Sequence, residues 1–325
     1  MKRQSATLSI DLDDFWSYRR SFGLPPHSGA VSLLPLAIPR FLDFMRRHGL
    51  HGTAFVVGAD ALRPEHAPLF RALAQAGHEI GNHSFSHAGD LEAWPAQQLR
   101  ADLTAAHAAI EAASGFTPHG FRGPSFRVSR ALLEEVRAMG YHYDASTFPN
   151  ALGALARRWQ AKSAARLGAR PLLATDTFGS RASARLPLTA YAWDLAGATL
   201  IEVPVTTLPG LRIPIHATYL QHLADSSTFA ARAFAFTLVE WCRRARVAPH
   251  YLLHATDFIG CDDGFDSAFL PGMRRRWQAK VALLDLLVDR LRASFELMPI
   301  DAFVSGLAAS KNMPTYPTDS LKVPR

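Results

Sequence analysis

The chain has 325 residues, of which 48% are hydrophobic and 19% charged, so it can bury a large core and is not a disordered chain. The net charge of +7 and the pI of about 9.7 favour acidic partners: a phosphate-bearing substrate, an anionic membrane or nucleic acid. We see no transmembrane run, signal-peptide core or nucleic-acid-binding motif. We therefore expect a cytoplasmic protein that does not bind nucleic acid, with the inner membrane face as a second expected location.

Short apolar strands alternate with helices along the chain. We predict strands at 7–10, 53–57, 78–81, 120–122, 141–144, 199–205, 250–254 and 295–298, and helices at 33–48, 65–76, 95–113, 130–138, 228–246 and 275–291. Pro64 at one helix start, and Gly49, Gly77 and Gly140 at helix ends, support these limits. This alternation predicts an α/β domain with parallel strands, in which chemistry lies at the carboxyl ends of the strands. We expect one domain over 1–309 and a loose tail over 310–325.

Residues 150–191 interrupt the pattern. This segment is rich in Ala and Arg, and we interpret it as a basic insertion over the active face. The hexapeptide RRWQAK occurs at 157–162 and again at 275–280. Both copies read as basic helix surfaces, either simply solvated or suited to a membrane interface or a phosphate. The two cysteines, Cys242 and Cys261, do not form a CxxC pair and favour reduced thiols over a disulfide.

The densest group of candidate ligands is GHEIGNHSFSH, where His83 and His87 are four residues apart. On a helical turn such residues share a face and can bind one ion. The acidic stretch Asp11-Leu12-Asp13-Asp14 ends the first strand and supplies a third ligand, as a catalytic zinc requires. A second aspartate is then available to accept a proton from water that the zinc activates. Alternation along an extended chain places Asp11 and Asp13 on one side and Asp14 elsewhere.

The order of SIDLDD, HGTAFVVG, GHEIGNHSFSH, FRGPSF and YLLHATDF resembles the polysaccharide deacetylase family, also called the NodB-homology domain or carbohydrate esterase family four. The resemblance runs from about residue 7 to 303 and is weakest in the insertion. It implies a deformed (β/α) barrel of about seven strands with the basic insertion over the active face. It also implies hydrolysis of an N-acyl group, acetyl or formyl, from an amino sugar with Zn²⁺ or another divalent metal such as Co²⁺ or Ni²⁺.

The resemblance assigns roles residue by residue. Asp13, His83 and His87 match the metal ligands, and Asp11 matches the general base in the D-x-D form of an intracellular branch. The alternative, with Asp13 as base and Asp14 as ligand, remains open. Arg122 matches the arginine that orients the base, and His254 matches the late histidine that protonates the leaving amine. Ser125 departs from the family pattern, because it replaces an aromatic residue beside an expected backbone oxyanion donor. Asp257 and Asp194 match the family's acidic partner of His254 only weakly and are candidates for that role.

The segment LIEVPVTTLPG resembles family members that act on lipid-linked or nucleotide-linked sugars. Together with the basic segments, it suggests an amino-sugar substrate with a phosphate or polyprenyl group, and peripheral contact with an anionic membrane. Two alternatives remain: an amidohydrolase for small cyclic ureides or imides, and a non-catalytic carbohydrate-binding protein.

Overall fold

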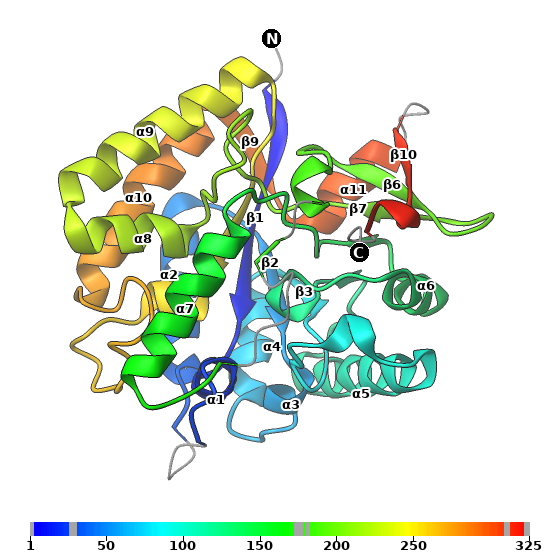
Figure 1. Cartoon of the computed structure of the whole chain (residues 1–325), viewed down its shortest axis with the longest axis horizontal. Coiled ribbons are helices and arrows are strands. Elements are labelled where there is room, and N and C mark those ends of the chain that lie inside the picture. The colour runs from blue at the N-terminus through cyan, green and yellow to red at the C-terminus, as the bar shows by residue number, and fades with distance from the viewer. Residues whose placement is uncertain (1–2, 26–30, 172–177, 180–181, 309–312, 322–325) are drawn as a thin grey trace.

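The computed structural model of the chain describes residues 3–25, 31–171, 178–179, 182–308 and 313–321. Within these residues one curved sheet has the strand order β10-β6-β7-β5-β4-β3-β2-β1-β8, and β9 pairs with β1 (Figure 1). The strands are β1 (Gln4–Leu12), β2 (Thr53–Val56), β3 (Glu79–Asn82), β4 (Gly120–Phe121), β5 (Tyr143–Asp144), β6 (Tyr191–Asp194), β7 (Thr199–Glu202), β8 (His250–His254), β9 (Phe295–Met298) and β10 (Thr315–Pro317).

The sheet is parallel apart from the β6–β7 pair, and the expected (β/α) architecture is confirmed. The seven strands β1–β5, β7 and β8 form a continuous parallel array, while β6, β9 and β10 extend it. The tail was expected to be loose, and this is wrong for part of it: β10 pairs with β6, and Tyr316 packs on Tyr191. Residues 310–312 and 322–325 of that tail lie outside the described residues.

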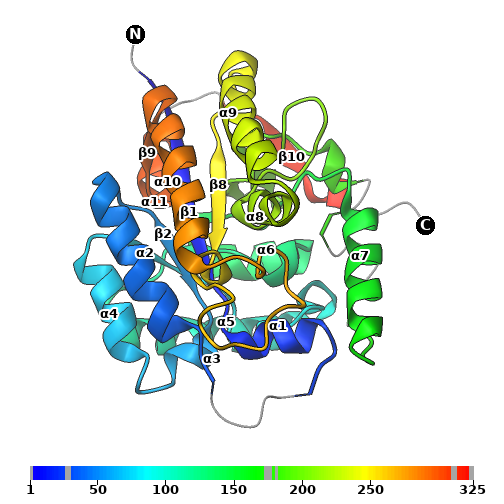
Figure 2. The same cartoon turned by 90° about the vertical axis from the view of Figure 1, so that its left-hand side faces the viewer.

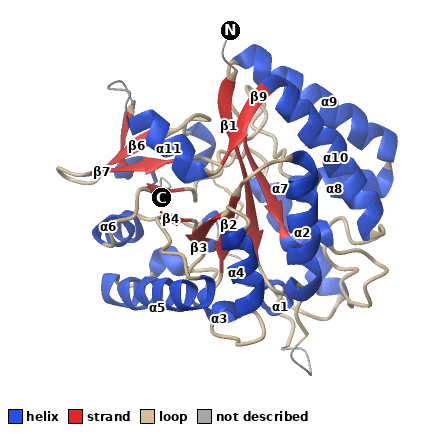
Figure 3. Ribbon diagram, turned by 180° about the vertical axis from the view of Figure 1, so that it is seen from behind, coloured by secondary structure: helices blue, strands red, loops and turns tan. Residues whose placement is uncertain are grey.

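Helices pack around the sheet, and Figure 3, the view from behind, shows α2, α4, α5 and α10 around the strands. The helices are α1 (Phe15–Ser21), α2 (Leu34–His48), α3 (Gly58–Ala61), α4 (Ala67–Gln75), α5 (Ala96–Ser114), α6 (Arg130–Ala138), α7 (Gly153–Arg166), α8 (Ala217–Ser226), α9 (Thr228–Ala245), α10 (Trp277–Ser294) and α11 (Ile300–Ala308). Helix α2 shows why such limits form where they do. Pro35 stands in its first turn, and Gly49 ends it at a φ of 59°, a conformation that glycine adopts without strain.

The strand register brings the motif residues to one edge of the sheet. Strands β1, β2 and β8 lie side by side (Figure 2). In the pairing of β1 with β8, Asp11 lies opposite His254, and in the pairing of β1 with β2 it lies opposite Phe55. Strand β3 ends at Asn82, which lies opposite Phe121 at the end of β4. Parallel strands present their carboxyl ends together, so residues distant in sequence meet here.

The insertion contributes α7, which stands beside the active edge of the sheet. Leu152, Leu155, Ala156 and Trp159 line a cavity there, while Arg158 of the same helix is exposed to solvent. The segment therefore meets the site through apolar side chains rather than through its charges. Two residues counted in its composition, Asp176 and Arg181, lie outside the described residues.

The second copy of RRWQAK is only partly a solvated basic surface: Arg276 is exposed, but Lys280, the basic residue in the helical part of the copy, is not. Trp277 begins α10 and lies beneath Arg40, whose guanidinium carbon is 4.1 Å from the ring centroid. Lys280 is fully buried, and its Nζ donates to the Thr256 carbonyl at 2.7 Å. The interpretation of both copies as helix surface is therefore wrong for this one, because Lys280 supports the turn that follows β8.

Both cysteines are free: Cys242 is buried in α9 and Cys261 is exposed. Within the described part of the chain, no helix combines the length and the apolar character needed to cross a membrane.

Candidate active site

Three side chains from two strand ends meet at one point. The Asp13 Oδ1 atom lies 3.0 Å from His87 Nε2 and 3.3 Å from His83 Nε2. Burial opposes ionisation of Asp13, but His87 and His83 outweigh it and hold its pKa well below the usual range. The pKa of His83 is raised because Asp11 and Asp13 outweigh its burial.

These residues fit a divalent cation. Asp13 Oδ1 and His87 Nε2 are both buried and make no hydrogen bond, although they are close together. One carboxylate oxygen and two imidazole nitrogens form a donor set typical of zinc and related metals. The His83 Nδ1 atom lies 2.6 Å from the Arg122 carbonyl oxygen, and donation to that oxygen leaves Nε2 as the metal-binding atom.

The loop after β3 is held in an unusual backbone conformation. Ser84 and His87 have φ values of 62° and 48°, in the left-handed region that is uncommon outside glycine. The Asp102 carboxylate accepts hydrogen bonds from the backbone N–H groups of Phe85 and Ser86, and the Ser84 hydroxyl accepts one from His87. The conformation that brings both imidazoles to Asp13 is therefore stabilised by specific contacts, including one from α5.

Asp11 stands beside this cluster without joining it. Its Oδ1 accepts a hydrogen bond from Arg122 Nη1 at 2.7 Å, and its Oδ2 lies 3.9 Å from His83 Nε2. Arg122 is 1% exposed and also donates to Ser9 and to the Ala145 carbonyl. The guanidinium therefore fixes the orientation of the Asp11 carboxylate at the edge of the cavity.

Asp14 does not reach this point. It caps the N-terminus of α1, and its Oδ1 accepts hydrogen bonds from the backbone N–H groups of Phe15 and Leu33, both at 2.7 Å. Of the two open assignments, the geometry therefore favours Asp11 as base and Asp13 as ligand.

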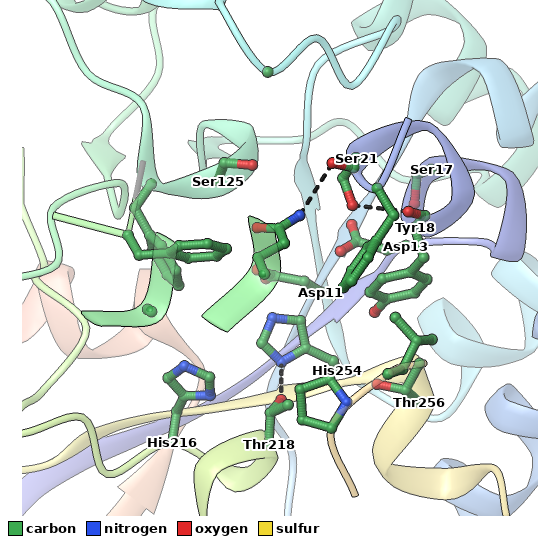
Figure 4. Close-up of a pocket in the computed structure, with 18 of the residues that line it drawn as sticks. Asp11, Asp13, Ser17, Tyr18, Ser21, Ser125, His216, Thr218, His254 and Thr256 are labelled. Atoms are coloured by element: carbon green, nitrogen blue, oxygen red, sulfur yellow. Dashed lines mark hydrogen bonds between the residues drawn. The ribbon is translucent and has the colours of Figure 1, made fainter. Parts of the chain in front are cut away.

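His254 ends β8 beside Asp11 and also lines the cavity, and neither expected acidic partner has its carboxylate hydrogen-bonded to the ring. The ring Nδ1 is 3.0 Å from the Thr218 hydroxyl of α8 (Figure 4). Asp257 instead accepts a hydrogen bond from the His254 backbone N–H, and Asp194 lies exposed at the end of β6. The candidate role of Asp194 is thus not supported. His216, which belongs to none of the sequence motifs, also lines the cavity, with its ring 5.3 Å from that of His254.

Figure 4 shows the cavity, of about 350 Å³, into which Asp11, Asp13 and His254 face. Apolar side chains from α1, α7 and the loop before α10 line much of it, including Phe22, Trp159 and Leu270. Tyr18 also lines it, and its hydroxyl is buried without a hydrogen-bond partner. The sequence analysis missed Tyr18 and the wall formed by α7 because neither belongs to a motif.

The turn after β4 completes the wall. Ser125 and Phe126 have φ values of 55° and 62°, and both line the cavity. This left-handed turn keeps the main chain of FRGPSF against the site, where an oxyanion donor was expected. Phe126 also stacks on Phe148 with ring centroids 4.4 Å apart.

The fold and the site together define a class: a (β/α) protein with an Asp-His-His cluster beside an arginine-bound aspartate. Residues 28–143 match the profile of the polysaccharide deacetylase family. The match contains His83, His87 and Arg122, whereas Asp11, Asp13 and His254 lie outside it and reach the site only through the fold.

Similar proteins agree with this placement. The chain is 31% identical over 104 residues to a peptidoglycan-N-acetylmuramic acid deacetylase of Bacillus subtilis, covering 32% of this chain and 38% of that protein. It is 33% identical over 116 residues to a chitooligosaccharide deacetylase of Bradyrhizobium, covering 34% and 52%. It thus spans about half or less of these relatives. A crystal structure of a candidate polysaccharide deacetylase from Mycobacterium smegmatis covers all of this chain and 98% of its own, with a TM-score of 0.61 and 17% identity, and shows the same fold.

Proposed function

We propose that this chain is a metal-dependent hydrolase that removes an N-acyl group from an amino sugar. The observation that carries the proposal is that Asp13, His83, His87, the arginine-bound Asp11 and His254 all line one cavity. The names of the relatives, which are deacetylases of peptidoglycan and chitooligosaccharides, support the same reaction class.

Each group has a role that follows from its position. Asp13, His83 and His87 would hold the divalent ion, which supplies Lewis-acid polarisation of the amide carbonyl and of water when bound. Asp11 is the general base, and the Arg122 contact keeps its carboxylate oriented toward the cavity. His254 protonates the departing amine, with Thr218 holding its Nδ1 so that Nε2 is the donating atom.

The cavity sets the class of substrate that we propose. Its volume of about 350 Å³ and its apolar wall suit a single sugar with an apolar substituent better than a long polar polymer in an open groove. Leu155 and Trp159 of α7 would contact that substituent. A lipid-linked amino sugar at the inner membrane face fits this wall and the net charge of +7.

The cavity size also bears on the alternative substrate class, a small cyclic ureide or imide. Such a ring fits the volume, but it would leave the apolar wall of α7 without a partner. We therefore keep ring opening as the control reaction of the test rather than as the proposed activity.

The test is release of acetate and formate by metal-loaded protein. The panel contains N-acetyl chitooligosaccharides, nucleotide-linked and polyprenyl-phosphate-linked N-acyl amino sugars, and allantoin. We expect metal-dependent acid release that is fastest with the polyprenyl-linked sugar. The variant Trp159→Ala should raise KM for that substrate and leave KM for the nucleotide-linked sugar unchanged, with the exposed Trp241→Ala as a matched control.

Equal rates on long chitooligosaccharides would contradict the substrate class while leaving the reaction in place. Ring opening of allantoin without acid release from any sugar would overturn the reaction itself.

A further inference from the structure

A second cluster of potential ligands lies on the other side of the acidic stretch. Candidate ligand atoms of Asp14, Asp60 and His66 lie within 4.8 Å of one another. Their exposed fractions are 0%, 1% and 0%, so the cluster is enclosed, whereas Asp13 and His87 open onto the cavity. None of these three residues belongs to the Asp13-His83-His87 cluster described above, although Asp14 follows Asp13 directly in the chain.

Two atoms in this cluster are buried without a partner: Asp60 Oδ2 and His66 Nε2. A buried polar atom that makes no hydrogen bond is costly, and the large majority of such atoms in folded proteins are paired with protein or ordered water. Their presence together, next to a second carboxylate, indicates that a ligand completes the cluster.

The orientation of His66 is that of a metal-binding histidine. Its Nδ1 lies 3.0 Å from the Asp60 backbone carbonyl oxygen, and donation to this acceptor makes Nδ1 the protonated nitrogen. The lone pair is then on Nε2. Histidines that bind metals typically donate their other ring nitrogen to a carbonyl or carboxylate in this way.

The charges also favour a cation. Burial, followed by the charge of Asp14, raises the pKa of Asp60 to about 8, even though the charge of Arg63 acts to lower it. Arg63 approaches Asp14, with Nη1 3.4 Å from Oδ2, but Asp60 Oδ2 receives no hydrogen bond from it. A divalent ion would satisfy both orphaned atoms and offset the repulsion between the two carboxylates.

We propose that Asp14, Asp60 and His66 form a second, structural site for a divalent transition metal such as Zn²⁺ or Mn²⁺. The oxygen and imidazole ligands are of the type that these metals accept. The site is linked to the first one: Asp60 Oδ1 accepts a hydrogen bond from Trp16 Nε1, and the Trp16 ring meets the His87 ring edge-on at 6.3 Å. An ion here would fix α1, and through Trp16 the ligand His87.

The test measures metal content by mass spectrometry on protein purified from medium supplemented with Zn²⁺ and Mn²⁺. We expect two equivalents per chain. Brief dialysis against EDTA should remove the ion at the cavity site and retain the enclosed one. His83→Ala should contain one EDTA-resistant equivalent, and Asp60→Asn or His66→Gln should contain one equivalent that EDTA removes.

His48→Gln is the matched control, because His48 also lies between two carboxylates, of Asp285 and Asp289, and it should retain both ions. Asp60→Asn keeps Oδ1 available to Trp16, so its fold is checked by circular dichroism before the metal analysis. One equivalent or less in the wild-type protein, all of it removed by EDTA, would overturn the proposal and assign a buried water to the cluster. This test measures metal content and not activity, so its outcome is independent of the proposed deacylase function.

Discussion

The two ends of the parallel strands use histidine in opposite ways. Strand β3 is preceded by His78 and followed by His83, and strand β8 begins with His250 and ends with His254. At the carboxyl ends, His83 faces Asp11 and Asp13 and its pKa is raised. At the amino ends, burial lowers the pKa of His78 to about 4 and of His250 to about 3.

The partners explain the difference. His78 Nδ1 accepts a hydrogen bond from the Gly52 backbone N–H, and His250 Nδ1 lies 3.0 Å from the Thr7 hydroxyl, so neutral rings suffice there. The same residue type therefore serves packing at one end and proton or metal chemistry at the other. This follows the general division of (β/α) folds, in which the amino ends of the strands carry stability and the carboxyl ends carry function.

The largest expected effect is at the carboxyl end, in Asp11→Asn. An amide keeps the shape of the side chain but cannot accept a proton, so turnover should fall by about 10²–10⁴-fold, the usual contribution of a general base. Metal content, measured by mass spectrometry, should stay unchanged because Asp11 is not one of the three ligands. Loss of the metal along with activity would instead make Asp11 a ligand.

At the amino end, His78→Asn should change the dependence of stability on pH. The unfolded histidine binds a proton below its usual pKa near 6.5, but the folded one binds it only below about 4. The wild-type protein therefore loses stability as the pH falls from about 6.5 to about 4, by roughly 3 kcal/mol in total.

Asparagine can accept the Gly52 hydrogen bond without titrating. As the pH falls from about 6.5 to about 4, the wild-type protein should therefore lose stability relative to His78→Asn. Urea unfolding at several pH values measures this difference in unfolding free energy. Deacylase activity at neutral pH should be retained. A difference that stays constant with pH would show that His78 is protonated in the folded protein.

Much of this contrast could be predicted from sequence, because the signals are local. His83 and His87 share a short motif, Asp11 and Asp13 alternate at a strand end, and the surrounding strands are short apolar runs. The assignment of Asp14 could not be fixed in this way. Whether an aspartate after a strand binds a metal or caps a helix depends on α1, which the sequence analysis did not predict.

The walls of the site were harder to predict, for a physical reason. Helix α7 is rich in Ala and Arg and has no side-chain N-cap, so its sequence shows a basic surface and hides the apolar wall formed by Leu155 and Trp159. Lys280 looks like a surface residue by type, but it is buried because the Thr256 carbonyl and Met273 receive its ammonium group. Both errors arise because tertiary contacts, and not composition, decide which side of a helix is buried.

Asp14→Ala tests whether Asp14 takes part in metal binding at the cavity. Loss of an N-cap costs about 0.5–2 kcal/mol, and Asp14 accepts one hydrogen bond from Phe15 of α1 and another from Leu33, so we expect a cost at or above the upper end, because the proposed enclosed ion would be lost as well. Ser129→Ala, which removes the single cap bond of α6, is the matched control and should cost about 1 kcal/mol. Urea unfolding measures both. Because Asp14 does not contact His83 or His87, the EDTA-sensitive metal should remain, and its loss would show that the two aspartates act as one site.

Tyr18→Phe should have the smallest effect. The signs of the changes in kcat/KM and in stability distinguish a substrate-binding role from a packing role. The Tyr18 hydroxyl is buried without a partner and lines the cavity, and burial, with Asp13 second, raises its pKa well above the usual value. A protonated hydroxyl facing the cavity is a donor for the substrate, so its removal should lower kcat/KM about three- to tenfold, the worth of one hydrogen bond. The same removal relieves an unpaired polar group in the free protein, so the urea midpoint should stay level or rise. A fall in stability with unchanged kinetics would place Tyr18 with the packing residues, and the functional groups after β1 would then end at Asp13, before α1.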